Sequence, residues 1–222
     1  MEDLIELAEK IENINLRTKI LSFLKNPEIS IEIFGDEMSI EEAPASKNVH
    51  HSYKAGLIEH TLSMTLIALG IVNVLQKIYQ IDFINKDFII AGGILHDIYK
   101  PLTYTKSDQK YKRSRLGSKI DHTSLIFAEA WSRKFPLELL HILLSHHGYG
   151  ASARPRSLEA YIIHFADYVD SQLFGDILKG AQNLINRAGK NVKIDNSKFA
   201  AMICHIMAKE GIEGVKNYLT KF

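Results

Sequence analysis

Five places in the chain carry histidine or aspartate side chains in an arrangement that suits metal binding. They are His60, the pair His96-Asp97, His122, the pair His146-His147 and Asp167. A lone histidine in an apolar stripe, such as His60 between Leu57 and Met64, is more often a core residue hydrogen-bonded to a neighbour. Asp167 lies among apolar residues, however, and a buried carboxylate is costly unless it is paired or metal-bound. Imidazole and carboxylate together suit Mn, Fe, Co, Ni or Zn.

The candidate ligands need a scaffold that brings distant positions together, and the apolar pattern predicts a helical one. Apolar residues recur at steps of three and four, whereas period-two alternation is almost absent. The predicted fold class is therefore all-α, and residues 29–34 are the only segment that resembles a strand. The main helices are expected at residues 3–25, 57–81, 86–97, 121–133, 136–145 and 157–174, with further helices behind them. The polar segment 99–119 is expected to be a loop or broken helices.

Five consecutive helices each carry a candidate ligand near one end or on an apolar face. Neighbouring residues on a helix point about 100° apart, so His96 and Asp97 cannot lie on one line along it. At the end of a helix they can still converge on neighbouring metal positions, with the carboxylate bridging the two. Gly92 and Gly93, one turn earlier, are expected to let a partner helix approach closely.

The composition fits one sizeable domain of a cytoplasmic protein. The 222 residues are 46% hydrophobic, and the net charge of +1 argues against a strongly basic nucleic-acid binder. Cys204 is the single cysteine, which excludes an internal disulfide and fits a reducing compartment. Acidic residues rather than a secretory signal follow Met1. The longest apolar stretch, residues 62–75, is shorter than the roughly 20 residues of a membrane span, so no membrane partner is expected.

The order H…HD…H…HH…D resembles the HD-domain metal-dependent phosphohydrolase superfamily, and HDIYK at residues 96–100 resembles its HD-x-x-K motif. The resemblance implies an HD-domain helical bundle with C-terminal helices at residues 43–222, preceded by a short N-terminal helical extension at residues 1–42. In two-metal members, one metal is held by the first histidine, the HD pair and the last aspartate, which implies His60, His96, Asp97 and Asp167. The second metal would share that aspartate and bind the later histidines, His122, His146 and His147.

Two longer stretches are similar to a narrower branch, the YhaM-type 3′–5′ exoribonucleases of bacteria. They are PASKNVHHSYKAGLIEHTLSM at residues 44–64 and LLSHHGYGASARPRSLEAYIIHFADYVDSQL at residues 143–173. The similarity covers roughly residues 43–175 and departs from the branch in two places. Tyr99 replaces the usual glycine of HD-I-G-K, which is expected to narrow the space beside the metals. A helical N-terminal segment stands where the branch has a nucleic-acid-binding OB domain.

The resemblance also implies a mechanism. Two divalent ions, with Mn expected first and Fe, Co, Ni or Zn as alternatives, would lower the pKa of a water and neutralise charge on a phosphoryl group. The predicted catalytic residues are Asp97, which would hold both ions, and Lys100, which would reach a phosphate oxygen. The predicted substrate-binding residues are His50, His51, Tyr53, Lys100, Arg154 and Arg156. His164, three residues before Asp167, is a candidate to support a ligand from behind.

The predicted function is a phosphodiesterase that acts on 3′ ends of single-stranded nucleic acid or on short oligonucleotides. The basic residues of segment 106–119, interleaved with Tyr104 and Tyr111, suit a single strand, with a solvated loop as the alternative. The missing OB domain favours a second candidate, a nucleotide phosphatase acting on mononucleotides. The remaining alternatives are a di-iron oxygenase of the inositol-oxygenase type and a non-catalytic nucleotide-binding regulatory module. The N-terminal helix could pack on the domain or form a dimer contact.

Overall fold

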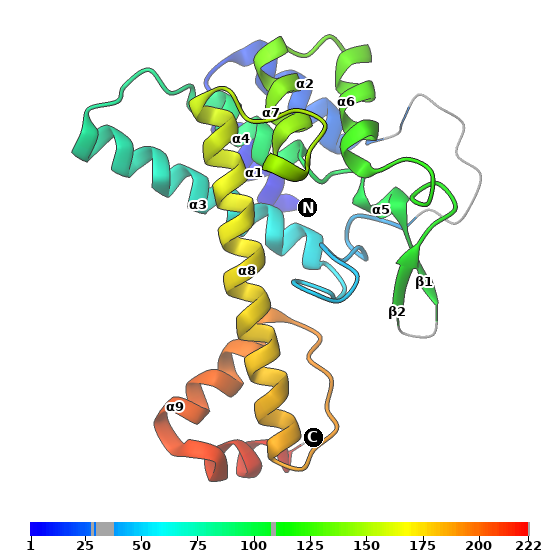
Figure 1. Cartoon of the computed structure of the whole chain (residues 1–222), viewed down its shortest axis with the longest axis vertical. Helices are drawn as coiled ribbons and strands as arrows, with labels where there is room; N and C mark the ends of the chain where they lie inside the picture. The colour runs from blue at the N-terminus through cyan, green and yellow to red at the C-terminus, as the bar shows by residue number, and fades with distance from the viewer. Residues whose placement is uncertain (28, 30–37, 108–109, 222) are drawn as a thin grey trace.

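The computed structural model describes residues 1–27, 29, 38–107 and 110–221, and its fold is mostly helical (Figure 1). The all-α prediction is therefore confirmed at the level of fold class. In chain order the elements are α1 (Glu2–Glu9), α2 (Ile14–Lys25), α3 (Gly56–Tyr79), α4 (Lys86–Leu95), α5 (Lys100–Thr103), β1 (Tyr104–Ser107), β2 (Lys110–Arg113), α6 (His122–Ser132), α7 (Leu137–Ser145), the 3-10 turn η1 (Gly148–Gly150), α8 (Leu158–Arg187) and α9 (Ser197–Leu219).

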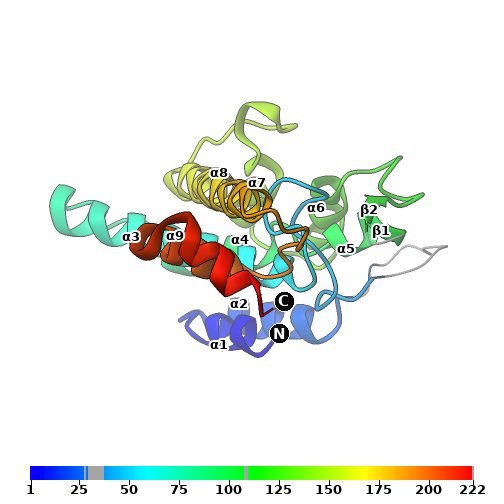
Figure 2. The same ribbon diagram turned by 90° about the horizontal axis from the view of Figure 1, so that it is seen from below.

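The helices that carry the candidate ligands are stacked around α4. Seen from below, α7 and α8 lie on one side of α4, and α1 and α2 lie on the other (Figure 2). One apolar core joins residues of α1, α2, α4, α6 and α7, and a second joins residues of α3, α4 and α8. Leu4 of α1 and Phe23 of α2 therefore share a core with α4, and the division of the chain at residue 42 stays a prediction.

Two glycines bring α4 close to its neighbours. A side chain at Gly93 would collide with Thr65 on α3, and one at Gly92 would collide with Ile142 on α7. The prediction that this pair permits a close approach is confirmed. The C-terminal end of α4, where His96 lies, is thereby held near both helices.

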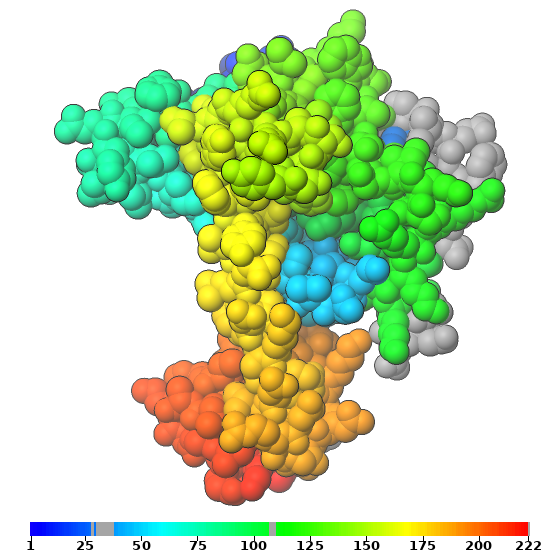
Figure 3. Space-filling view, in the orientation of Figure 1, coloured from blue at the N-terminus to red at the C-terminus, as the bar shows by residue number. Residues whose placement is uncertain are grey.

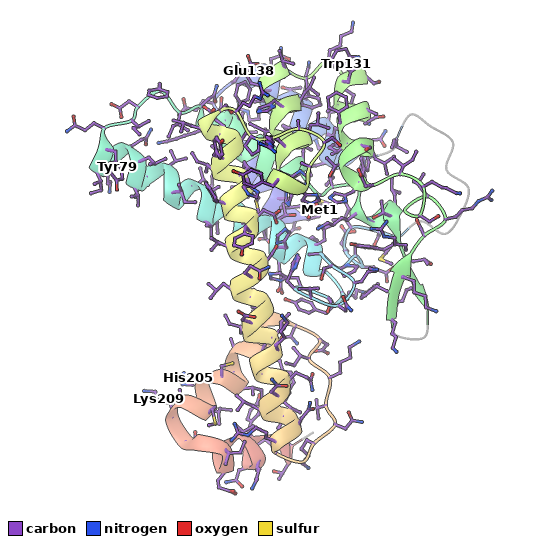
Figure 4. The ribbon with its side chains drawn as sticks, viewed as in Figure 1. Met1, Tyr79, Trp131, Glu138, His205 and Lys209 are labelled. Carbon is purple, nitrogen blue, oxygen red and sulfur yellow. The ribbon has the colours of Figure 1, made fainter. Side chains whose placement is uncertain are left out.

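α8 is longer than the sequence analysis predicted, because it continues to Arg187 rather than ending near Phe174. Its second half packs with α9 around a separate apolar core that includes Ile185 and Ile203. We call this part the α8–α9 lobe, and it stands below the main body in the space-filling view (Figure 3). His205 and Lys209 project from the outer side of α9 in the α8–α9 lobe (Figure 4).

The segment 99–119 contains a β-hairpin where a loop or broken helices were predicted. Strands β1 and β2 are antiparallel, with Tyr104 opposite Arg113 and Thr105 opposite Lys112. Aromatic and β-branched residues favour such pairing. Ser114 closes the neck of the hairpin, because its N–H donates to the Thr103 carbonyl at 2.9 Å.

The single helix predicted at residues 3–25 is two helices, α1 and α2. Asp87 of α4 stabilises the break, since its carboxylate accepts hydrogen bonds from the N–H groups of Glu12 and Asn13, each at 2.8 Å. The Asn13 side chain then caps α2 by accepting from the Leu16 N–H at 3.0 Å. A partner so distant in sequence leaves no local signal. The strand-like segment 29–34 lies outside the described residues apart from Ile29.

α3 has the length and apolar composition of a helix that could cross a membrane, with a mean hydropathy of 1.6 over its most apolar window. The sequence analysis counted only residues 62–75 and so underestimated this length. Within the fold, α3 contacts α4 and α8, and His60 and Met64 lie on its buried face. The central helix of a helical domain has these same properties.

Candidate metal centre

Asp97 occupies the middle of a buried group of histidines just after the end of α4. Its Oδ1 lies 3.0 Å from His122 Nε2 and 3.9 Å from His146 Nε2. Its Oδ2 lies 3.2 Å from His96 Nε2 and 3.5 Å from His60 Nε2. The two carboxylate oxygens therefore face two different pairs of histidines.

Asp167 and His147 complete the two sets. Asp167 Oδ1 lies 3.2 Å from His60 Nε2, on the side of the first pair. The His147 ring lies 4.1 Å from the His146 ring and 5.1 Å from the His122 ring, measured between centroids. The fold thus brings together every residue predicted as a metal ligand, and we call them the His–Asp cluster: His60, His96, Asp97, His122, His146, His147 and Asp167.

Backbone carbonyls orient two of these histidines. His96 Nδ1 donates to the Gly93 carbonyl at 2.7 Å, and His146 Nδ1 donates to the Leu143 carbonyl at 2.8 Å. Each carbonyl belongs to the last turn of the preceding helix, three residues before its histidine. These bonds place a proton on Nδ1 and turn the Nε2 atom of each ring toward Asp97.

Several polar atoms of the cluster are buried without a well-oriented hydrogen bond in the described part of the chain, although Lys100 pairs with Asp97 and His122 lies close to it. They include both Asp97 carboxylate oxygens, His122 Nε2 and His146 Nε2. An unsatisfied buried polar group costs about 1–3 kcal/mol. A divalent cation fits this donor set, because imidazole nitrogens and carboxylate oxygens are its common ligands in proteins.

Charges inside the cluster favour the protonation states that bind cations. Burial alone would raise the pKa of Asp97, but His96, Lys100 and His122 hold that pKa well below its usual range. Burial lowers the pKa of His146 well below its usual value, so its imidazole is neutral. Burial also acts to lower the pKa of Lys100, but its ion pair with Asp97 outweighs burial and raises the pKa. The anionic carboxylate and the neutral imidazole are the forms that bind metals.

His60 is the exception, because a proton competes with a cation for its Nε2. Burial alone would lower the pKa of His60, but hydrogen bonds to Asp167 and Asp170 outweigh it and raise the pKa well above its usual value. Metal binding at this nitrogen would therefore release a proton.

Asp170 belongs to the site by its contacts, and the sequence analysis missed it. It is buried one turn after Asp167 on α8, and its Oδ2 accepts hydrogen bonds from His60 Nδ1 at 2.7 Å and from His51 Nε2 at 3.1 Å. The Ser63 hydroxyl donates to its other oxygen. A carboxylate behind a metal-binding histidine fixes the tautomer and orientation of the ring. The spacing of three residues between the two aspartates puts both on one face of α8 and could have revealed it.

The predicted substrate-binding residues near α3 lie at different depths. His51 and Tyr53 are buried: His51 Nδ1 lies 2.9 Å from the Tyr53 hydroxyl, which donates to Glu59 at 2.7 Å. His50 is half-buried, and its ring centroid lies 5.1 Å from that of His60. Burial and the nearby charge of His60 lower the pKa of His50 to about 3. Of His50, His51 and Tyr53, only His50 is both next to the His–Asp cluster and partly exposed.

The two predicted arginines lie outside the His–Asp cluster. Both are exposed, and the Arg154 guanidinium contacts the Tyr149 ring at 5.3 Å from its centroid. Within the described residues, neither Arg154 nor Arg156 forms an ion pair with the cluster. His164 does support it from behind, since its Nδ1 donates to the His146 carbonyl at 2.8 Å.

Tyr99 lies where the related motif has glycine, and its ring points into the core rather than beside the metals. The residue is 1% exposed, and its ring centroid lies 5.7 Å from that of Phe23 on α2. The expected narrowing of the metal site by this side chain is therefore wrong, because α2 supplies an apolar contact for the ring.

The chain is similar to proteins of a known family. The sequence profile described as HD domain matches residues 57–172, which is more than half of the chain. The "dihydroneopterin 2′,3′-cyclic phosphate phosphodiesterase" of Methanocaldococcus jannaschii is 47% identical over 78% of this chain and 70% of its own. The "3′-5′ exoribonuclease YhaM" is 26% identical in Bacillus licheniformis, over 92% and 69%, and 26% in Bacillus subtilis, over 87% and 62%. No solved structure matches the chain.

Proposed function

Because the chain belongs to the HD-domain family, we propose that it is a phosphodiesterase that opens the cyclic phosphodiester of a small molecule. The chain is an HD-domain phosphohydrolase with a His/Asp metal site, and the proposal concerns its substrate. The proposed substrate is a 2′,3′-cyclic phosphate carried by a dihydroneopterin or a compound of similar size. One observation carries this choice, the 47% identity over 78% of the chain to a relative whose name states that activity.

We assign the metal ions to two positions that share Asp97. One would be held with His60, His96 and Asp167, and the other with His122, His146 and His147. Divalent ions held there would stabilise negative charge on the phosphoryl group and lower the pKa of a water. Mn is the first choice. Fe, Co, Ni or Zn remain alternatives, because a mixed nitrogen and oxygen donor set does not select among these metals.

Lys100 would bind the substrate phosphate. Its ammonium group pairs with Asp97 inside the cluster and stays charged, because the ion pair raises its pKa. A buried ammonium beside the metal positions can donate a strong hydrogen bond to a phosphoryl oxygen. Hydrolysis of the cyclic phosphodiester adds water across one P–O ester bond and leaves a phosphomonoester and a free hydroxyl.

Single-stranded nucleic acid is the competing substrate. The YhaM relatives support it at lower identity, 26%. Lys106, Lys110 and Lys112 of the hairpin are exposed, which suits contact with a phosphate backbone. We place the small cyclic phosphodiester first because the relative that supports it is the more similar of the two.

The test compares substrates under one condition. Purified protein loaded with Mn²⁺ is incubated separately with dihydroneopterin 2′,3′-cyclic phosphate, adenosine 2′,3′-cyclic phosphate and 5′-labelled single-stranded RNA. We expect chromatography to detect a phosphomonoester product from the pterin compound and intact RNA on a gel. Shortened RNA together with intact cyclic phosphates would overturn the proposal in favour of the exonuclease.

Two variants keep the test specific to the metal centre. Asp97→Asn should abolish turnover, since the buried carboxylate that faces both histidine pairs loses its charge. Asp176→Asn is the matched control, because Asp176 is an exposed carboxylate in the second half of α8. Chelation with EDTA should stop the wild-type reaction, and added Mn²⁺ should restore it.

A further inference from the structure

A cavity of about 310 Å³ lies between the segment that follows α7 and the first turns of α8. We call it the ring cavity, and its main side chains are Tyr149, Tyr161, Phe165, His164, Arg154 and Arg156. The ribbon and space-filling views place this yellow-green segment and the upper end of α8 on the same exposed face of the molecule (Figures 1 and 3). The mechanism above uses none of these side chains.

The ring cavity is unusually rich in exposed aromatic surface. Tyr161 and Phe165 lie one turn apart on α8, with ring centroids 6.2 Å apart and planes inclined by 22°. Tyr149 is 87% exposed and carries the Arg154 guanidinium beside its ring. Exposed aromatic faces next to a guanidinium offer stacking and cation–π contacts to a flat ligand.

The ring cavity adjoins the segment that carries two of the candidate metal ligands, His146 and His147. His164 lines the cavity, and its Nδ1 donates to the carbonyl of His146 at 2.8 Å. Gly148, which follows His147, has a φ of +61° and lies so close to the His164 ring that a side chain there would collide with it. The lining of the cavity is therefore hydrogen-bonded to His146 through His164 and follows directly after His147 at Gly148.

We propose that the ring cavity binds the planar heteroaromatic ring of the substrate whose phosphodiester is cleaved at the metal centre. This inference rests on the proposed function, since it assumes a small substrate that joins a ring to a cyclic phosphate. The volume is near the lower limit of ligand pockets, which suits a bicyclic ring better than a run of nucleotides.

The arginines indicate which ring edge would be recognised. Arg presents paired N–H donors that match an oxo group beside a ring nitrogen, as in its contact with guanine O6 and N7. A dihydropterin carries the same acceptor pair, an oxo group next to an imine nitrogen. We therefore assign Arg154 and Arg156, which the sequence analysis predicted as substrate-binding residues, to the edge of the ring.

The first test measures binding without turnover. Neopterin, which is fluorescent and has no phosphate to lose, is titrated into Mn²⁺-loaded protein. Tyr149→Ala and Phe165→Ala should each weaken neopterin binding about 5- to 100-fold, the range for loss of one aromatic stacking partner. Tyr168→Ala is the matched control, because Tyr168 is an exposed tyrosine on α8 that does not line the ring cavity.

The second test compares kcat/KM for two cyclic phosphodiesters, dihydroneopterin 2′,3′-cyclic phosphate and glycerol 1,2-cyclic phosphate, which has no ring. In Tyr149→Ala and Phe165→Ala the ratio of the two values should fall at least as far as neopterin binding does. An unchanged ratio, or no binding of neopterin by the wild type at millimolar concentration, would overturn the ring cavity as a subsite. Ring binding that depends on Tyr149 in a protein that hydrolyses neither ester would support the cavity and overturn the proposed function instead.

Discussion

The two halves of α8 have the same backbone structure and opposite chemistry. The first half places Asp167 and Asp170 against His60, where buried charges face one another. The second half places Ala181 and Ile185 against α9, in an apolar core. A buried carboxylate needs particular partners at particular distances, whereas apolar side chains need only good packing. Substitutions in the first half should therefore change metal binding and catalysis, and substitutions in the second half should change stability alone.

The largest effect is expected for Asp167→Asn in the first half of α8. The neutral amide cannot balance a cation beside His60, from which Asp167 Oδ1 lies 3.2 Å. Activity should fall more than about 100-fold, beyond the 10- to 100-fold typical of groups that only support a ligand. Metal content by mass spectrometry and turnover of the cyclic phosphate are the measurements. A fully active Asp167→Asn would remove the first half of α8 from the metal centre.

Asp170→Asn should have the next largest effect. The amide keeps the size of the side chain but loses the charge that faces His60 Nδ1 and His51 Nε2. We expect metal affinity to fall about 10- to 100-fold, measured by competition with a chromophoric chelator. The folded content by circular dichroism should stay unchanged. An equal loss of affinity in Asp176→Asn would show that charge on α8, rather than this contact, matters.

In the core that the second half of α8 shares with α9, Ile203→Ala should lower stability without changing the chemistry. Ile203 of α9 is fully buried, and truncation of a buried isoleucine costs about 2–5 kcal/mol. Urea denaturation should detect this loss, while kcat of the folded protein stays at the wild-type value. A lower kcat below the unfolding transition would contradict the separation of the two halves.

The smallest effect is expected at the start of α9. The Asn196 side chain accepts a hydrogen bond from the Phe199 N–H at 2.8 Å and so caps the helix. Asn196→Ala should lower the free energy of unfolding by about 1 kcal/mol. Lys198→Ala serves as the comparison, because Lys198 is exposed in the first turn of α9 and does not cap the helix. A loss of stability equal to that of Ile203→Ala would mean that α9 depends on its cap as much as on its core.

Features with local signals could be predicted from the sequence. Helix starts at Asp121 and Ser157 were recognisable because short polar side chains cap them, and both accept the expected hydrogen bonds from Ser124 N–H and Ala160 N–H. The order of the histidines and aspartates indicated the family and the members of the cluster. Each of those ligands lies near a helix end or on an apolar face. The residue types on either side of it in the sequence therefore indicate its position in the helix.

Features that depend on distant partners could not be predicted in the same way. The break between α1 and α2 relies on Asp87 of α4, and the extension of α8 relies on α9. The role of Asp170 follows from His51, His60 and Ser63, which reach it from other parts of the chain. The spacing of Asp167 and Asp170 was a local signal for the position of Asp170, but the contacts themselves join residues too distant in sequence to be seen as a pattern.

The closed neck of the hairpin has a consequence for how this chain could vary. Thr103 and Ser114 are joined by a hydrogen bond of 2.9 Å, so the chain leaves the domain and returns at one point between Asp97 and His122. The length of the hairpin beyond this hydrogen bond therefore has no effect on the distance between Asp97 and His122. Related proteins could therefore carry a different segment in place of the β1–β2 hairpin without a change in the metal centre.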